Sequence, residues 1–179
     1  MNQTTAFVIS LFLAGLSLTG CAAWSTYPAI PGAMQVGHPE VEPLPTIMAE
    51  AIRYCNGRFL KAEEPAFNLP EGVTVHTYEA VRRRLDAGRP MTEAGELAVH
   101  VRQVRVRGTS AQVDVVYPRG DGMHQFMTLH MKQRWVNRFE VEQTRLWRIH
   151  VQVPEPQYPL FEQEELEELE AVATAPVGD

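Results

Sequence analysis

Cysteine is scarce in this chain, since Cys21 and Cys55 are the only two among 179 residues. A globular body of this size buries enough apolar surface to fold without disulfide bonds. We therefore expect no disulfide framework. Cys55 is predicted to be a small, buried, apolar side chain, because a reactive thiol needs an exposed, cationic setting.

Lysine is equally scarce: the chain has two lysines against fourteen arginines. The formal net charge of −6 is misleading, because seven of the 22 acidic residues lie in residues 162–179, which contain no lysine or arginine. The other fifteen acidic residues face sixteen basic ones, so the body of the protein is almost neutral. This balance gives no reason to expect nucleic-acid binding.

Metal-binding and catalytic motifs are also missing. The six histidines show no His-x-x-x-His or Cys–His spacing, and His124 and His130 are separated by about 20 Å if they share a strand face. His100 and His150 are predicted to lie opposite the apolar faces of their strands, exposed to solvent. No Gly-x-Ser-x-Gly motif or phosphate-binding glycine loop is present. We therefore expect neither a metal nor a cofactor.

An uncharged apolar run, residues 6–18, is the only long one in the chain. Its length is typical of a signal peptide and falls short of the roughly 20 residues that span a bilayer. It leads into Leu18-Thr19-Gly20-Cys21, which resembles the lipobox of bacterial lipoproteins: a branched apolar residue, two small residues and an invariant cysteine. One departure from the pattern is that residues 1–5 contain no lysine or arginine. A buried N-terminal helix and a plain secretory signal remain as alternatives.

The lipobox resemblance implies that the chain is cleaved before Cys21 and that Cys21 is acylated, which anchors the protein to a membrane. It leaves Cys55 without a disulfide partner. Ala22 stands where the family's inner-membrane retention signal has an aspartate, so the resemblance implies the periplasmic face of the outer membrane. The expected organisation is a signal peptide (1–20), a proline-rich tether (21–45), an α+β domain (46–156) and an acidic tail (157–179), disordered or forming a short helix.

The domain itself is predicted to hold two helices followed by a curved, four-stranded antiparallel meander. Helical periodicity covers residues 46–60 and 74–88, and alternation covers residues 97–108, 111–117, 123–133 and 137–153. In the first strand the apolar parity switches near residues 102–103, which predicts a β-bulge there. In the last strand, Trp147, Ile149, Val151 and Val153 are predicted to share the core face.

The stretch "GTSAQVDVVYPRGDGMHQFMTLHMKQ" and the tryptophan-containing strand "RLWRI" resemble the nuclear-transport-factor-2-like superfamily of cone-shaped α+β domains. The resemblance covers residues 46–153 and implies a sheet that curves around a central space. Some enzymes of this superfamily keep an aspartate or histidine as an acid or base inside that cone.

Asp114, flanked by Val113 and Val115, is the carboxylate that best fits such a role, with His76 or Tyr54 as a partner. The simpler interpretation is that Asp114 points outward and pairs with an arginine of the first strand. Arginines 102, 105, 107, 145 and 148 are further candidates for a basic sheet face. The favoured function is a lipid-anchored binding or structural module, with an envelope protein or a small ligand as partner. The alternative is a small isomerase, dehydratase or hydrolase.

Overall fold

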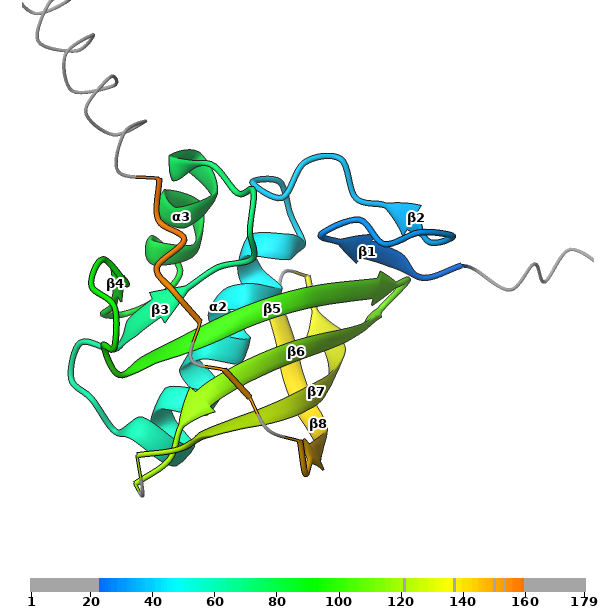
Figure 1. The fold of residues 1–179 in the computed structure, drawn as a ribbon. Helices are drawn as coiled ribbons and strands as arrows, with labels where there is room; N and C mark the ends of the chain where they lie inside the picture. Colours follow the sequence, from blue (N-terminus) through cyan, green and yellow to red (C-terminus); the bar gives the residue numbers. More distant parts are fainter. Residues whose placement is uncertain (1–22, 121, 137, 150, 153, 160–179) are drawn as a thin grey trace, which may run out of the picture.

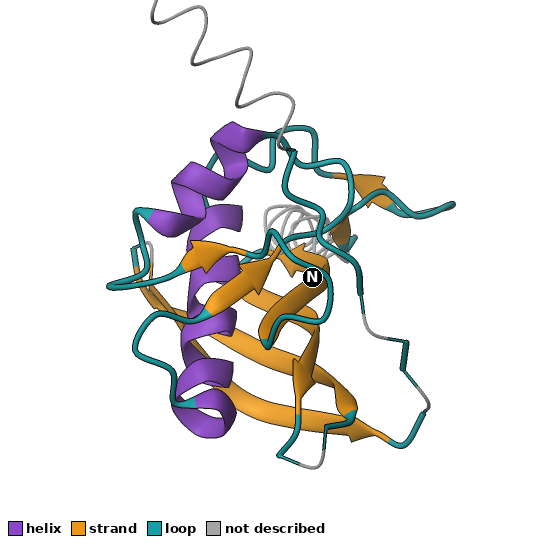
Figure 2. Cartoon of the chain, turned by 60° about the vertical axis from the view of Figure 1, so that its left-hand side comes forward, coloured by secondary structure: helices purple, strands orange, loops and turns teal. Residues whose placement is uncertain are grey.

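Figures 1 and 2 show a computed structural model of the chain, which describes residues 23–159 except 121, 137, 150 and 153. The described residues form two α-helices, one π-helical turn and a single sheet of eight strands, which confirms the α+β class. In chain order the elements are β1 (Ser25–Tyr27), β2 (Met34–Gln35), α2 (Leu44–Cys55), η1 (Asn56–Leu60), β3 (Ala66–Asn68), α3 (Val75–Arg82), β4 (Arg89–Pro90), β5 (Ala98–Arg107), β6 (Ser110–Pro118), β7 (His124–Trp135) and β8 (Arg138–Trp147). Within these residues no helix is long and apolar enough to cross a membrane.

The predicted antiparallel meander is present as β5–β6–β7–β8, but it accounts for only half of the strands. Four short strands extend the sheet beyond β5. β1 pairs antiparallel with residues 104–106 of β5, and β3 pairs parallel with residues 98–100. β2 and β4 then pair parallel with β1 and β3. The predicted sheet of four strands therefore had too few strands.

The predicted bulge in β5 is confirmed. The register with β6 shifts between Val101 and Gln103, so Arg102 is the extra residue. Because of this shift, Val99, Val101 and Val104 are all buried on the same, core-facing side of the sheet.

A second register shift, between β7 and β8, reverses the predicted face of Trp147. His130 pairs with Gln143 and Met131 with Val141, which leaves Glu142 as the extra residue. Beyond this point the residues of β8 that face the core change parity. Trp147 consequently lies on the face opposite the core, and Ile149 is 56% exposed. The prediction of a shared core face is wrong, and its fourth member, at position 153, lies outside the described residues.

Helix α2 fills the concave side of the sheet, which curves around it (Figure 1). Ile47, Met48, Ile52 and Cys55 of this helix have no solvent-exposed surface. Burial raises the pKa of the Cys55 thiol to about 12, which confirms the prediction of an inert, buried cysteine. The helix begins two residues earlier than predicted, and Thr46 lies inside it, where its hydroxyl donates a hydrogen bond to Glu42 (2.8 Å).

The N-terminal segment predicted to be a tether belongs largely to the folded body. Thr26 and Tyr27 of β1 are buried against β5, and α2 already begins at Leu44. A segment fastened at both ends cannot act as a long extended spacer. The described chain therefore starts directly at the sheet.

After β8 the chain turns back across the sheet face that points away from α2. We call this face the outer face, and the described residues between 148 and 159 the strap; Figure 1 shows the strap passing in front of β5 and β6. The strap ends against α3, where the Tyr158 ring meets the Tyr78 ring edge-on at 4.9 Å. Residues 157–159, predicted to be the start of the acidic tail, are thus part of the folded body. Residues 160–179 lie outside the described residues.

Candidate binding site beneath the C-terminal strap

The structure does not bring the three candidate catalytic residues together. Asp114 lies on the outer face of the sheet, whereas Tyr54 lies on α2 and packs against the core on the other side. His76 is exposed on α3. The pKa of the nearby Glu40 is lowered chiefly by a backbone hydrogen bond, then by His38, and least by His76. The sheet separates Asp114 from Tyr54, so these residues cannot act jointly on one substrate.

Asp114 is the centre of a hydrogen-bond chain that crosses four strands of the outer face. Its Oδ1 accepts hydrogen bonds from Arg105 Nη2 (2.8 Å) and from the Thr128 hydroxyl (2.6 Å). Thr128 in turn accepts one from Trp147 Nε1 (3.0 Å), and Arg105 donates another to Gln103 (2.9 Å). The predicted pairing with an arginine of the first meander strand is confirmed. The expectation that the side chain is solvated is wrong, because Asp114 is only 8% exposed.

The arginines predicted to form a basic face have separate roles. Arg107 lies over the ring of Trp24, 4.7 Å from its centre, and Arg145 lies over the ring of Trp147 at 3.9 Å. Arg105 is engaged by Asp114. Arg102 and Arg148 line hollows of the outer face.

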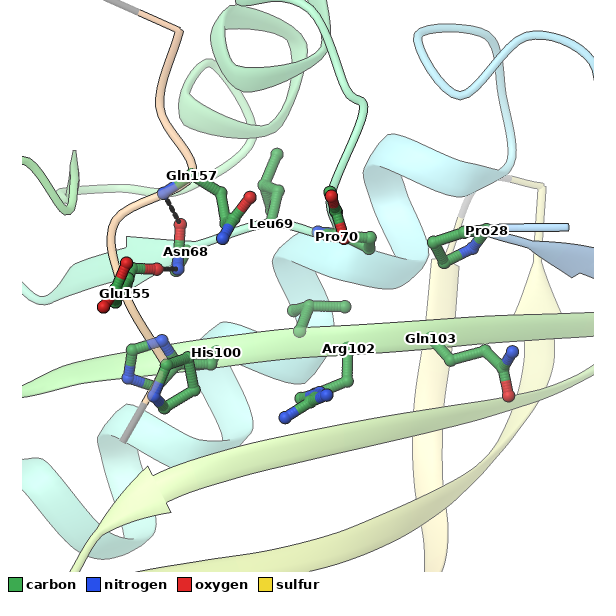
Figure 3. A pocket seen from close by; sticks show the side chains of 12 residues that line it. Pro28, Asn68, Leu69, Pro70, His100, Arg102, Gln103, Glu155 and Gln157 are labelled. Atoms are coloured by element: carbon green, nitrogen blue, oxygen red, sulfur yellow. Dashed lines mark hydrogen bonds between the residues drawn. The ribbon is translucent and has the colours of Figure 1, made fainter. Parts of the chain in front are cut away.

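Asn68 fastens the strap to the body of the protein. This residue is 1% exposed at the end of β3, and Figure 3 shows its side chain directed at the strap. Its Nδ2 donates to the Glu155 carbonyl (2.7 Å), and its Oδ1 accepts from the Gln157 backbone N–H (3.0 Å). The Tyr78 hydroxyl also donates to Oδ1 (3.0 Å) and so orients the amide. The Asn68 side chain thus bonds to the backbone of the strap, as the backbone of a neighbouring strand would.

His100 is buried next to this clamp without a hydrogen-bond partner. It is 1% exposed, and neither Nδ1 nor Nε2 bonds to another described residue. Burial, then the nearby His124 and Arg102, lower the pKa of His100 to about 4, so the imidazole is neutral at pH 7. The prediction of a solvated histidine is wrong here. The ring of His124 lies 6.1 Å away between centroids, a proximity that β5 and β7 create across β6.

Three hollows form a continuous row along the outer face beneath and beside the strap. The first, of about 340 Å³, is lined by His100 and Arg102, with Asn68 and the strap opposite (Figure 3). It shares Arg102 and Gln103 with a second hollow of about 620 Å³, which reaches Asp114. A third of about 560 Å³ shares strap residues 149, 151 and 152 with the second and extends to His124.

The chemistry of this row suits a polar ligand that meets both signs of charge, because Glu71, Glu155 and Asp114 line it as well as Arg102. A neutral imidazole offers one donor and one acceptor, and a buried polar group without a partner has a free energy cost that a ligand can remove. The Arg102 guanidinium supplies a cation next to it. No group of three potential metal ligands occurs among the described residues.

Sequence reasoning found Asp114 and the arginines but missed the importance of His100, Asn68 and the strap. Alternation places His100 on the outer face, where a histidine is normally wet. The strap lies beside it, although the alternation of residues 137–153 predicts a continuous strand over most of that segment. The sequence around His100 does not indicate burial, because the strap residues that lie beside it come more than fifty positions later in the chain.

Comparisons with protein-family models, with characterised proteins and with solved structures gave no match to this chain.

Proposed function

We propose that the protein is a lipid-anchored binding module of the bacterial cell envelope, attached to the membrane through acylated Cys21. Its ligand is a small polar molecule or a polar segment of another envelope protein. The binding region is the row of hollows beneath the strap, with Arg102 in its wall and the enclosed His100 directly behind it. The likeness to bacterial lipoproteins at residues 18–21 supports the anchor.

One observation carries the choice of a binding module: the concave side of the sheet is filled. α2 contributes Ile47, Met48 and Ile52 to the core there, each without exposed surface, so the described residues leave no interior pocket on that side. Three of the hollows lie on the outer face, open to solvent and bordered by the strap. A further hollow between α2 and β8, lined in part by Tyr54, is an open groove at the edge of the concave side and does not enter the core. Shallow, polar, partly covered surfaces suit recognition better than enclosure of a reaction.

The alternative is a small enzyme with its active site inside a cone. The candidate catalytic residues for such a site do not lie together. Asp114 is occupied by Arg105 and Thr128, and Tyr54 and His76 lie elsewhere. A general acid or base must reach its substrate directly or through one water. These residues do not converge on one position.

The anchor is tested by the mass of the N-terminal peptide and by fractionation. We expect the protein purified from membranes to begin at Cys21 with acyl chains attached, and the Cys21→Ala variant to lose them and leave the membrane fraction. An unmodified Cys21 in membrane-bound protein would contradict the anchor.

Binding is tested by photocrosslinking in intact cells. A photoreactive amino acid at Gln152, which lines two of the hollows, is expected to form a discrete adduct. The matched control is Glu63, an exposed position between η1 and β3. His100→Phe and Arg102→Ala are expected to weaken the adduct at 152. Equal labelling from both positions, or none from 152, would contradict a binding site here.

A further inference from the structure

The tip of the hairpin between β7 and β8 exposes two neighbouring apolar side chains. Trp135 is 75% exposed and Val136 is 87% exposed, the highest values among the large hydrophobic residues that the structure describes. Exposed tryptophan is uncommon on soluble surfaces, whereas its amphipathic ring is favoured at the boundary between a bilayer and water. This pair therefore needs an explanation that the outer-face site does not supply.

The hairpin tip lies at the same end of the sheet as the start of the described chain. Strand register shows this directly, because Ser25 pairs with Val106, Arg107 with Ser110, and Ser110 with Lys132. The Gln133 N–H also donates to the carbonyl of Thr109 (2.8 Å), which ties the base of the tip to the β5–β6 turn. In Figure 1, the start of β1 lies beside the C-terminal end of β5, where that turn begins.

The connection from Cys21 to this end is short. Only Ala22 and Ala23 separate Cys21 from Trp24, a reach of roughly 10 Å at about 3.3–3.6 Å per residue. Trp24 is itself held beneath Arg107, and β1 is hydrogen-bonded to β5. An acyl anchor at Cys21 would therefore hold this end of the sheet near the bilayer, instead of leaving the body on a long tether.

The residues around the tip carry charge of the sign that suits anionic lipids. Residues 132–138 contain Lys132, Arg134 and Arg138 and no acidic residue. Further along β8, Glu140 pairs with Arg134 (3.5 Å) and Arg138 (3.6 Å), and Glu142 pairs with Arg134 (3.0 Å), so these three basic and two acidic residues leave a net charge of +1. Basic side chains beside an exposed tryptophan reach headgroup phosphates while the ring enters the interface.

We infer that this end of the sheet is a membrane-seating surface, in which Trp135 and Val136 enter the interfacial layer of an anionic bilayer and the flanking basic residues contact its headgroups. This inference rests on the proposed anchor at Cys21. It also fixes the orientation of the domain. Trp147 lies about 30 Å from the tip along β8, at about 3.3 Å per residue, so the part of the outer face around Trp147 points away from the bilayer.

The test uses the full chain, expressed with its own leader, purified from membranes and reconstituted into nanodiscs that contain phosphatidylglycerol. The protein is labelled with 5-fluorotryptophan, which gives one ¹⁹F resonance for each of its three tryptophans. Trp135→Phe and Trp147→Phe assign the signals. With spin-labelled lipid present, we expect the Trp135 resonance to be lost and the Trp147 resonance to remain. A sharp Trp135 signal in protein with acylated Cys21, or loss of the Trp147 signal instead, would overturn the seating surface.

A second measurement separates this inference from the anchor. The Cys21→Ala protein is sedimented with vesicles of phosphatidylglycerol or of phosphatidylcholine alone. We expect binding to the anionic vesicles only, and its loss in a Trp135→Ser/Val136→Ser variant. Leu97→Ser is the matched control, since Leu97 is 65% exposed at the opposite end of β5. Equal binding by all three proteins would refute the seating surface even if Cys21 is acylated in the wild type.

Discussion

Replacing Asn68 with alanine should release the strap and destabilise the whole domain. The substitution removes three hydrogen bonds, to the Glu155 carbonyl, the Gln157 N–H and the Tyr78 hydroxyl. At a net contribution of about 1 kcal/mol each, the loss is about 3 kcal/mol in the free energy of unfolding. For a domain of this size about 1 kcal/mol shifts Tm by about 4 °C, so a decrease of about 12 °C is expected.

The assay has a global and a local readout. Circular dichroism follows Tm, and hydrogen exchange follows the backbone amides of residues 154–159. Release of the strap predicts fast exchange in these residues under conditions where the core strands stay protected. If Asn68→Ala melts within a few degrees of the wild type and exchange in the strap is unchanged, the amide clamp does not hold the strap and the reasoning fails.

Two controls separate the clamp from general damage. Tyr78→Phe removes the hydroxyl that orients Asn68 and that accepts the Leu69 N–H (3.1 Å), but it leaves both strap contacts. We expect it to cost about 2 kcal/mol with the strap still protected. Deleting residues 160–179 spares the clamp, and the composition of that acidic segment predicts little change in Tm.

Three further substitutions test the outer face. Asp114→Asn should lower the free energy of unfolding by about 1–3 kcal/mol in urea titrations, because Arg105 and Thr128 both donate to this buried carboxylate; a variant as stable as the wild type would show that the chain across the strands contributes little. The pKa of His100 is about 4 in the fold against 6.5 for the free side chain, so unfolding takes up a proton between these values and stability decreases as pH falls from about 6.5 to about 4. The decrease amounts to about 3 kcal/mol at most, and His100→Gln should remove it; a pH profile identical in both proteins would contradict the burial of a neutral imidazole. Trp147→Ala should lower the free energy of unfolding by about 1–2 kcal/mol, because the ring is half-buried on the outer face. A core tryptophan would cost roughly 3–5 kcal/mol, and a loss of that size by calorimetry would place Trp147 in the core.

The meander was predictable because each of its strands carries its own alternation. Val113 and Val115 must face one side and Asp114 the other, whatever the rest of the chain does. The β5 bulge was predictable for the same reason. Val99 and Val101 stand at odd positions and Val104 and Val106 at even ones, so both pairs can face the core only if one extra residue lies between them. In β8 the sequence predicts a break or bend near Thr144, but the polar run Glu142–Gln143–Thr144 gives no apolar parity, so the true face of Trp147 could not be predicted.

Residues 67–72 were predicted to be a connector or a short edge strand, and β3 overlaps this range; the other short strands escaped prediction because two or three residues carry no measurable period. β1 exists because the open edge of β5 offers unpaired N–H and C=O groups, and the pairing buries Thr26 and Tyr27 there. Its proline-rich surroundings read as a linker on composition alone. At the other end of the chain, the alternation through residues 149–153 predicts a continued strand, whereas β8 ends at Trp147 and the chain turns back towards Asn68.

The candidate site combines both kinds of information. The amino-acid sequence determined by itself that Asp114 faces away from the valine side of its strand, that Cys55 is apolar in role, and that residues 18–21 resemble a lipobox. Only the tertiary structure decided that α2 fills the concave side, that His100 is enclosed, and that Trp135 lies at the same end of the sheet as the N-terminal strand. The reason is that side-chain alternation is a local consequence of backbone geometry, whereas enclosure depends on which distant segment is free to cover a surface. That choice is made by the balance of all contacts in the folded chain.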